Sequence, residues 1–389
     1  MRVFPFTKRE KCDTIERKEI VARKGTEKEK KMSHLEKFRA ALAEKGADAA
    51  VIGSKLNQRY LSDFDFDDGF VLVTKGQSYL ITDFRYVEAA NEQRDPGLEV
   101  LTPNFGMLNC MRELLHENGC RTVMIEEDTL SFGDYEKYCE KLGEVKLISG
   151  ASALLNELRL YKDERELERM VRAQAITDAA FTHIVNFIKP EMTEIEVALE
   201  LDFFMRRNGA DALAFETIAV SGTSSSRPHG VPGRRKLEKG FLTMDFGAQI
   251  GGYCSDMTRT LVIGRADAEM KKLYNTVLRA QTESLAAYCE GASCAALDKI
   301  ARDIIDGVPE YRGTFGHSLG HGVGLFIHEN PRVSSRAGDA VLARGNVVTC
   351  EPGIYLEGKY GCRIEDMVAI RPDGSVYNFT HSTKELIEV

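Results

Sequence analysis

The chain lacks several features that mark particular classes of protein. Its 389 residues contain no Trp, and no window approaches the roughly 18 consecutive apolar residues of a membrane-spanning helix. No apolar segment follows the basic start, so a secretory signal is not expected. An excess of basic residues is missing too: 52 Lys and Arg stand against 60 Asp and Glu, a formal net charge of −8. This balance argues against a protein that coats nucleic acid. We therefore expect a cytoplasmic protein that binds neither membranes nor nucleic acid.

Two kinds of motif are also missing. The nine cysteines are scattered singly, without a CxxC pair, and their odd number in a chain without an export signal predicts reduced thiols. No glycine-rich phosphate-binding loop of either common pattern is present, so nucleotide chemistry has no support. What remains is an ordinary globular composition, with 43% apolar and 29% charged residues, in a chain long enough for two or three domains.

The charge is unevenly distributed along the chain. Residues 1–31 carry 11 Lys and Arg against 6 Asp and Glu, a net charge of +5 that leaves −13 for residues 32–389. Because this basic leader has few apolar residues, we expect it to be poorly ordered. Met32, which directly precedes a segment with helical periodicity, is a candidate for the natural start.

Residues 47–150 alternate short apolar runs with helical stretches. The runs AAVIG, GFVLVT, SYLIT, LEVLT, TVMIEE and VKLIS predict the strands of a modest α/β domain. A polar stretch at 156–162 then leads to Asp163, a plausible N-cap for a long helix. We therefore expect an N-terminal domain at 32–159 and a second domain at 160–389.

Two further patterns describe the start of the second domain. The long helix after Asp163 should place one set of residues on a single face: Leu167, Met170, Val171 and Gln174. Thr193, with Glu196 three residues later, matches a capping box and predicts the start of a second helix.

The run FLTMDFGAQIGGYCSDMTRTLVI predicts a hairpin with its turn at Gly251–Gly252. This register places Asp245 opposite Thr258 and diagonal to Asp256, so that two carboxylates share one face. Carboxylates side by side on apolar strands repel each other unless a proton or a cation lies between them.

Further fragments add histidines and acids. GTFGHSLGHGVGLFIHEN contains three histidines among glycines, and neutral imidazole is the commonest protein ligand of metals: His317, His321 and His328. CEPGIY and GCRIEDMVAI supply Glu351, Arg363 and Glu365. Each of these residues alone is more often structural, so the prediction depends on their combination. A ligand set dominated by carboxylates suits two divalent ions that share bridging carboxylates better than one tetrahedral zinc ion. Such a pair serves hydrolysis, and the residues alone predict a dinuclear hydrolase.

Together, these fragments resemble the pita-bread metallopeptidases, most of all their proline-specific branch, aminopeptidase P and prolidase. The pattern MDFG, then SDMTRT, HSLGHGVG, EPGIY and RIED occurs in the order typical of that family, and the resemblance covers residues 32–389. It implies an α+β architecture in which a pita-bread catalytic domain follows a smaller, creatinase-like α/β domain.

The resemblance also implies roles for individual residues. Five positions match the family's metal ligands, with Asp256 and Glu365 as the bridging pair: Asp245, Asp256, His321, Glu351 and Glu365. Three histidines match positions that contact the substrate and stabilise the intermediate: His229, His317 and His328. Arg363 matches an arginine that orients the carboxylates, and Tyr355 matches an aromatic position at the substrate. In the mechanism implied, Glu351 shuttles the proton of the attacking water and His328 helps to hold the oxyanion.

The activity implied is release of the N-terminal residue from peptides whose second residue is proline, as in a Xaa-Pro aminopeptidase. The resemblance implies two divalent metal ions per chain, Mn²⁺ first with Co²⁺ or Zn²⁺ as alternatives, and a homodimer. Prolidase, which accepts only Xaa-Pro dipeptides, is the main alternative, and the motifs do not separate the two. Methionine aminopeptidase usually lacks the first domain, and creatinase lacks the metal ligands. A non-catalytic binding protein on the same fold is the remote alternative.

Overall fold

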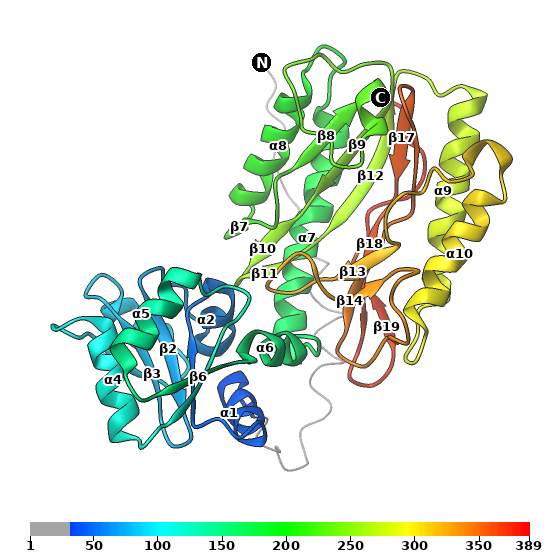
Figure 1. Cartoon of the computed structure of the whole chain (residues 1–389). Helices are drawn as coiled ribbons and strands as arrows, with labels where there is room; N and C mark the ends of the chain where they lie inside the picture. Colours follow the sequence, from blue (N-terminus) through cyan, green and yellow to red (C-terminus); the bar gives the residue numbers. More distant parts are fainter. Residues whose placement is uncertain (1–31) are drawn as a thin grey trace, which may run out of the picture.

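The protein has two lobes that meet near the start of a long helix, α7 (Glu164–Phe187; Figure 1). The structure, a computed structural model, describes residues 32–389, so the predicted basic leader at 1–31 lies outside the described residues. The smaller lobe, blue to cyan in Figure 1, comes from the first part of the chain, and the larger lobe, green to red, follows it. No helix among residues 32–389 is long and apolar enough to cross a membrane.

The smaller lobe is built on a six-stranded sheet with the order β4-β3-β2-β1-β5-β6. β1, β5 and β6 run parallel, β2 is antiparallel to both β1 and β3, and β3 is parallel to β4. All six predicted strands are present: β1 (Ala49–Ile52), β2 (Gly69–Thr74), β3 (Ser78–Thr82), β4 (Glu99–Leu101), β5 (Thr122–Ile125) and β6 (Lys146–Ser149).

Helices cover both faces of this sheet. On one face, Val51 and Leu72 pack in a cluster with α4 (Met107–Glu117) and the end of α5 (Phe132–Leu142). On the other face, Ile52 and Val71 belong to a cluster that includes α1 (His34–Glu44), α2 (Lys55–Ser62), α3 (Val87–Gln93) and α6 (Ala151–Arg159). Because successive strand residues face opposite sides, the near-continuous apolar runs follow from burial on both faces.

The first half of the larger lobe packs two helices on a three-stranded sheet. α7 (Glu164–Phe187) and α8 (Glu194–Arg207) begin at the predicted N-caps, Asp163 and Thr193, each within a complete capping box. They cover the sheet β12-β9-β8, formed by β8 (Ile218–Ser221), β9 (Gly240–Phe246) and β12 (Met257–Ile263). Val171 does not share the buried face of α7: it is 37% exposed, because the buried stripe runs through Met170 and Thr177 and Val171 lies beyond its edge.

The second half repeats this arrangement with other elements. α9 (Ala268–Ala286) and α10 (Cys294–Asp306) pack in a separate core cluster with strands of the five-stranded sheet β14-β13-β15-β18-β19. Its strands are β13 (Gly320–Gly322), β14 (Glu329–Val333), β15 (Val347–Cys350), β18 (Asp366–Ile370) and β19 (Val376–Asn378). A two-stranded ribbon joins β16 (Gly353–Leu356) to β17 (Tyr360–Arg363). Two helix-covered sheets facing one another give the expected pita-bread shape.

The predicted hairpin forms with the predicted register, but it bends between two sheets. Asp245 on β9 pairs with Thr258 on β12, and the turn at Gly251–Gly252 has both φ angles positive, as the tight turn requires. The tip, β10 (Ala248–Ile250) and β11 (Tyr253–Cys254), pairs instead with β7 (Ala212–Leu213). Asp245 and Thr258 lie on the side of the sheet away from α7 and α8.

The link between the lobes is not the polar stretch expected at 156–162. Residues up to Arg159 belong to α6, and both Arg159 and Lys162 are buried against Glu329 of the larger lobe. These polar residues therefore belong to a buried ion-pair network and not to a solvent-exposed linker.

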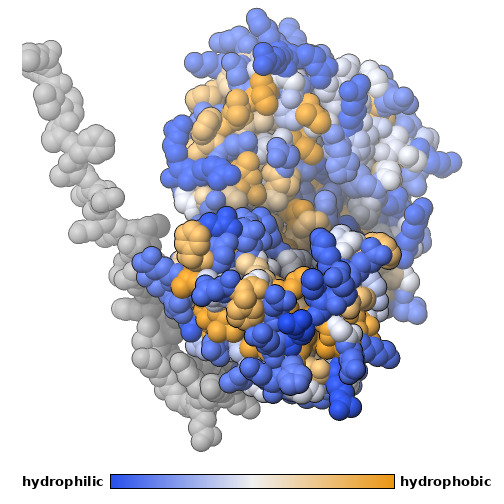
Figure 2. Space-filling view, turned by 60° about the vertical axis from the view of Figure 1, so that its left-hand side comes forward, coloured by the Kyte–Doolittle hydropathy of each residue, from blue (hydrophilic) through white to orange (hydrophobic). Residues whose placement is uncertain are grey.

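Hydrophilic residues predominate on the face shown in Figure 2, and hydrophobic residues gather in patches on both lobes. The eight cysteines of the described residues are all free.

Candidate metal centre and active site

One cavity of about 410 Å³ in the larger lobe brings together nearly all the predicted site residues. Its wall contains the five predicted metal ligands: Asp245, Asp256, His321, Glu351 and Glu365. Three predicted histidines and the predicted arginine also line it: His229, His317, His328 and Arg363. Residues up to 136 positions apart in the sequence, from 229 to 365, therefore share one cavity.

Three of the five ligand candidates lie at strand ends, where local geometry changes. Asp256 immediately precedes β12 and Glu365 lies in the break between β17 and β18. Glu351 follows β15 directly, while His321 is central in the short strand β13. Side chains at strand ends are held by the rigid sheets yet are free of the strict alternation within them, so they can converge.

His321 presents a lone pair to the acids. Its Nδ1 lies 3.1 Å from the carbonyl oxygen of Gly322 and donates a hydrogen bond to it, which leaves Nε2 as the free acceptor. Nε2 lies 3.5 Å from Asp256 Oδ2 and 3.4 Å from Glu351 Oε1, which are both acceptors when ionised. Burial lowers the pKa of His321 to about 3, so the ring is neutral. Such an arrangement is typical of a metal-binding histidine, whose second nitrogen is fixed by a carbonyl group.

The carboxylates around His321 repel one another. Burial raises the pKa of Asp256 and of Glu365 well above the usual values, and neighbouring carboxylates raise them further. Burial likewise raises the pKa of Glu351 to about 8. Oδ1 of Asp245 is buried without a hydrogen-bond partner among the described residues. Buried acids of this density are stable only when they hold protons or cations.

Arg363 compensates only part of this negative charge. Its guanidinium donates to Asp245 Oδ2 at 2.6 Å and to Thr258 Oγ1 at 2.9 Å. Thr258 in turn donates to Glu365 Oε2 at 2.7 Å. Arg363 thus fixes the orientation of two acids, one directly and one through Thr258. The sequence placed Thr258 opposite Asp245 but gave no sign of this bridging contact.

Tyr355 lies behind the cavity wall rather than among its lining residues. Its hydroxyl group accepts a hydrogen bond from Arg363 at 2.9 Å and lies 2.9 Å from His317 Nε2. His317 Nδ1 donates to the carbonyl oxygen of Ser318 at 2.9 Å, so Nε2 accepts a hydrogen bond from the Tyr355 hydroxyl group. Burial lowers the pKa of His317 to about 3. Tyr355 therefore orients Arg363 and His317, and direct contact with substrate remains a prediction.

The rim of the cavity contains His328, His229 and a residue that sequence reasoning missed, Arg332. The His328 ring packs edge-on against His321, with ring centroids 4.5 Å apart. Burial, and then the nearby Arg332, lower the pKa of His328. Arg332 follows His328 by four residues, and no motif distinguishes it from an ordinary surface arginine.

The donor set fits divalent cations. Asp256 Oδ, His321 Nε2 and Glu365 Oε atoms lie within 4.8 Å of one another, and all three residues are buried. With Asp245 and Glu351 beside them, oxygen donors dominate the set, as hard or borderline divalent ions prefer. Four carboxylates outnumber the two arginines of the cavity wall, Arg363 and Arg332, so bound cations would complete the charge balance.

Comparison with known proteins agrees with this geometry. Residues 168–372 match the family model described as metallopeptidase family M24, and residues 34–161 match the creatinase/prolidase N-terminal domain. The chain belongs to metallopeptidase family M24. The predicted pita-bread fold with a creatinase-like first domain is thereby confirmed. Family membership implies divalent metal ions at the site, without saying which.

Similar M24 proteins include both predicted specificities. The Xaa-Pro dipeptidase of Pyrococcus furiosus is 35% identical over 91% of this chain and 99% of its own length. A Xaa-Pro dipeptidase structure from Bacillus anthracis is 39% identical, with a TM-score of 0.87 over 92% of this chain and 99% of that one. An X-Pro aminopeptidase structure from Thermotoga maritima is 34% identical, with a TM-score of 0.83 over 88% and 98%.

Proposed function

We propose that the protein is a dinuclear metallo-exopeptidase that hydrolyses the bond between an N-terminal residue and proline. The observation that carries this proposal is the convergence of five candidate ligands in one cavity: Asp245, Asp256, His321, Glu351 and Glu365. The names of the M24 relatives supply the proline specificity.

The chemistry follows from the groups around the cavity. Two divalent ions, when bound, lower the pKa of a water molecule and stabilise the negative charge that develops on the scissile carbonyl. Glu351 can take up a proton from water and return it to the leaving amine. His328 lies at the rim, where an N–H group can donate to the oxyanion. Arg363 and Thr258 keep Asp245 and Glu365 in place.

The sequence prediction placed aminopeptidase first and dipeptidase second, and relatives have both names. The cavity favours the dipeptidase. Its wall contains two arginines, and Arg363 is already occupied by Asp245 and Tyr355. Arg332 forms no ion pair with any acid among residues 32–389 and is exposed at the rim. In a Xaa-Pro dipeptide the proline carries a free carboxylate, which Arg332 can bind as a charge-assisted pair.

The experiment compares a Xaa-Pro dipeptide with a tripeptide that has Xaa-Pro at its N-terminus. Protein loaded with Mn²⁺ should release the first residue of the dipeptide faster, and Arg332→Gln should raise KM for the dipeptide about tenfold while changing the tripeptide little. Chelation should abolish both activities. Equal cleavage of both peptides with no effect of Arg332→Gln would make the protein an aminopeptidase. Cleavage of neither would contradict proline specificity.

We also propose Mn²⁺ as the native metal, with Co²⁺ or Zn²⁺ as alternatives. A homodimer and a cytoplasmic location are two further proposals. Elemental analysis of protein loaded with each metal separately, combined with its activity, tests the choice of metal, and light scattering tests the homodimer. Fewer than one ion per chain after loading would favour the remote alternative, a non-catalytic binding protein.

A further inference from the structure

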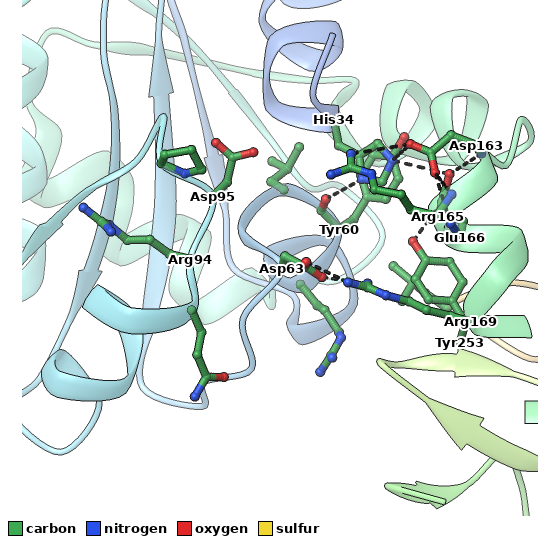
Figure 3. A pocket seen from close by; sticks show the side chains of 15 residues that line it. His34, Tyr60, Asp63, Arg94, Asp95, Asp163, Arg165, Glu166, Arg169 and Tyr253 are labelled. Carbon is green, nitrogen blue, oxygen red and sulfur yellow. Dashed lines mark hydrogen bonds and ion pairs between the residues drawn. The ribbon is translucent and has the colours of Figure 1, made fainter. Parts of the chain in front are cut away.

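A second group of potential metal ligands lies where the two lobes meet, far along the chain from the peptidase centre. His34 is the first residue of α1 in the smaller lobe, and Asp163 and Glu166 form the capping box at the start of α7 in the larger lobe. Figure 3 shows the three side chains pointing toward one another across the junction, beside a cavity of about 150 Å³. One oxygen or nitrogen atom from each lies within 4.8 Å of the others.

The His34 ring is held in one orientation. Its Nδ1 donates to the carbonyl oxygen of Tyr60 at 3.0 Å, and the Tyr60 ring stacks on it with centroids 4.1 Å apart. Nε2 is therefore the ring nitrogen that faces the acids. That atom is fully buried and has no hydrogen-bond partner among residues 32–389.

Glu166 is fixed just as firmly. Its side chain is 4% exposed, its Oε1 accepts from the Tyr253 hydroxyl at 2.8 Å, and its Oε2 accepts from the Asp163 backbone N–H at 2.6 Å. Each carboxylate oxygen can accept a further bond, so Oε2 can also bind a cation. Of the nearby arginines, Arg169 is bound by Asp63 through two bonds of 2.7 Å, and the largely exposed Arg165 lies 3.6 Å from Asp163 Oδ2.

The spacing of these atoms matches that of ligands around a cation. His34 Nε2 lies 3.4 Å from Glu166 Oε2 and 3.7 Å from Asp163 Oδ2. The corresponding separations from His321 Nε2 in the peptidase centre are 3.5 and 3.4 Å. Ligands about 2.1 Å from a tetrahedral zinc ion lie about 3.4 Å apart. A similar imidazole-to-carboxylate spacing therefore occurs twice among residues 32–389.

We propose that His34, Asp163 and Glu166 form a separate binding site for one divalent cation of the zinc class. The two carboxylates together balance one dication, and the imidazole adds a nitrogen ligand. The Tyr60 carbonyl group and the Tyr253 hydroxyl group orient the ligands, as supporting groups do at metal sites. The adjoining cavity leaves room for water as the fourth ligand. Because the ligands come from α1 and α7, the ion links the two lobes and stabilises their junction, without taking part in peptide hydrolysis.

The experiment measures zinc bound per chain by equilibrium dialysis at micromolar Zn²⁺ in wild type, His34→Gln and a control, His183→Gln. His183 lies on α7, the helix that contains Glu166, and its Nε2 is 2.7 Å from Glu200 Oε1, an ordinary hydrogen-bond distance. Wild type and His183→Gln should bind one more equivalent than His34→Gln. Zn²⁺ should also raise the melting temperature of His34→Gln less than that of wild type.

A second variant guards against a failure of His34→Gln to fold. Asp163→Asn keeps a good N-cap for α7 while removing the anionic ligand, and it too should bind one equivalent less. Asp256→Asn changes only the peptidase centre. The double variant with His34→Gln should therefore bind one equivalent of zinc less than Asp256→Asn alone. Equal zinc binding by wild type, His34→Gln and Asp163→Asn would overturn the proposal. So would a loss of stability in metal-free His34→Gln without any change in bound zinc, because a proton on His34 would then join the lobes.

Discussion

His328 lies at the rim of the cavity, where an N–H group can reach the substrate carbonyl without binding a metal ion. Removing one oxyanion donor typically costs on the order of 10² to 10³ in kcat. We expect His328→Asn to lower kcat on a Xaa-Pro dipeptide by about that factor, with little change in bound metal. Kinetics and elemental analysis of the same sample measure both quantities, and His116→Asn, at an exposed position of α4, is the control. Loss of metal in His328→Asn would show that this histidine is instead a ligand.

Individual residues differ in how far the sequence could place them. The five candidate ligands have chemistry that is unusual for their surroundings: acids and a histidine within apolar strands and among glycines. Thr258, Tyr355 and Arg332 have no such signal. Thr258 acts by joining Arg363 to Glu365, which lies 107 residues away. Such a contact depends on how β12 meets the segment between β17 and β18, and no local pattern records it.

At the scale of elements, three parts of the chain meet at one buried glutamate. Glu329, the first residue of β14, pairs with Arg159 at the end of α6 at 3.2 Å and with Lys162 of the linker at 2.9 Å. The three side chains are 4%, 8% and 1% exposed, and the two cations keep the pKa of Glu329 low despite its burial. Removing one member of a buried ion pair leaves an uncompensated charge, which costs about 3–5 kcal/mol.

We therefore expect Glu329→Ala to lower the free energy of unfolding by about 3–5 kcal/mol in urea titrations. The matched control is Glu310→Ala, which breaks the exposed pair with Lys272 and should cost under about 1 kcal/mol. If both variants lost the same free energy of unfolding, the buried network would contribute no more stability than an exposed ion pair. Glu329 is also the residue next to His328. The peptidase activities of the variant and of wild type should therefore be compared at temperatures where the variant remains folded.

Elements whose ends have a local chemical signal were predictable. Asp163 and Thr193 each accept hydrogen bonds from backbone N–H groups of the first helical turn, and the capping-box pattern in the sequence marks the starts of both helices. The end of α6 has no such signal, because its last residue, Arg159, is polar for a tertiary reason. A polar residue in an interface between lobes resembles a loop residue when only its neighbours in sequence are known.

At the scale of the whole molecule, how the sheets pack together could not be predicted from spacing. The hairpin register was predictable because turn and alternation define it locally. Its division between the sheets β12-β9-β8 and β11-β10-β7 depends on contacts with α7. The resemblance to a known family supplied the architecture that periodicity could not.

The packing of these sheets concentrates acids in one place, and the stability of the whole molecule should depend on pH as a result. Burial raises the pKa of Glu351 to about 8 and those of Asp256 and Glu365 well above their usual values. Without cations, the folded protein then binds more protons than the unfolded chain, so stability falls as pH rises toward and through these values. His321 and His317, with pKa values lowered to about 3, act in the opposite direction. Their effect ends above the ordinary histidine pKa of about 6.5.

The window from pH 7.0 to 8.5 therefore isolates the carboxylates. In this window, the free energy of unfolding of chelator-treated protein should fall by up to about 1.4 kcal/mol per pH unit for each extra proton that the folded protein binds relative to the unfolded chain. Saturating Mn²⁺ should remove most of this loss, because cations replace the protons between the acids. The gap between melting temperatures with Mn²⁺ and with chelator should thus widen from pH 7.0 to 8.5. Glu365→Gln, an isosteric neutral variant, should show a smaller pH dependence in chelator. A gap that is equal at both pH values would mean that the acids do not share their charge with bound cations.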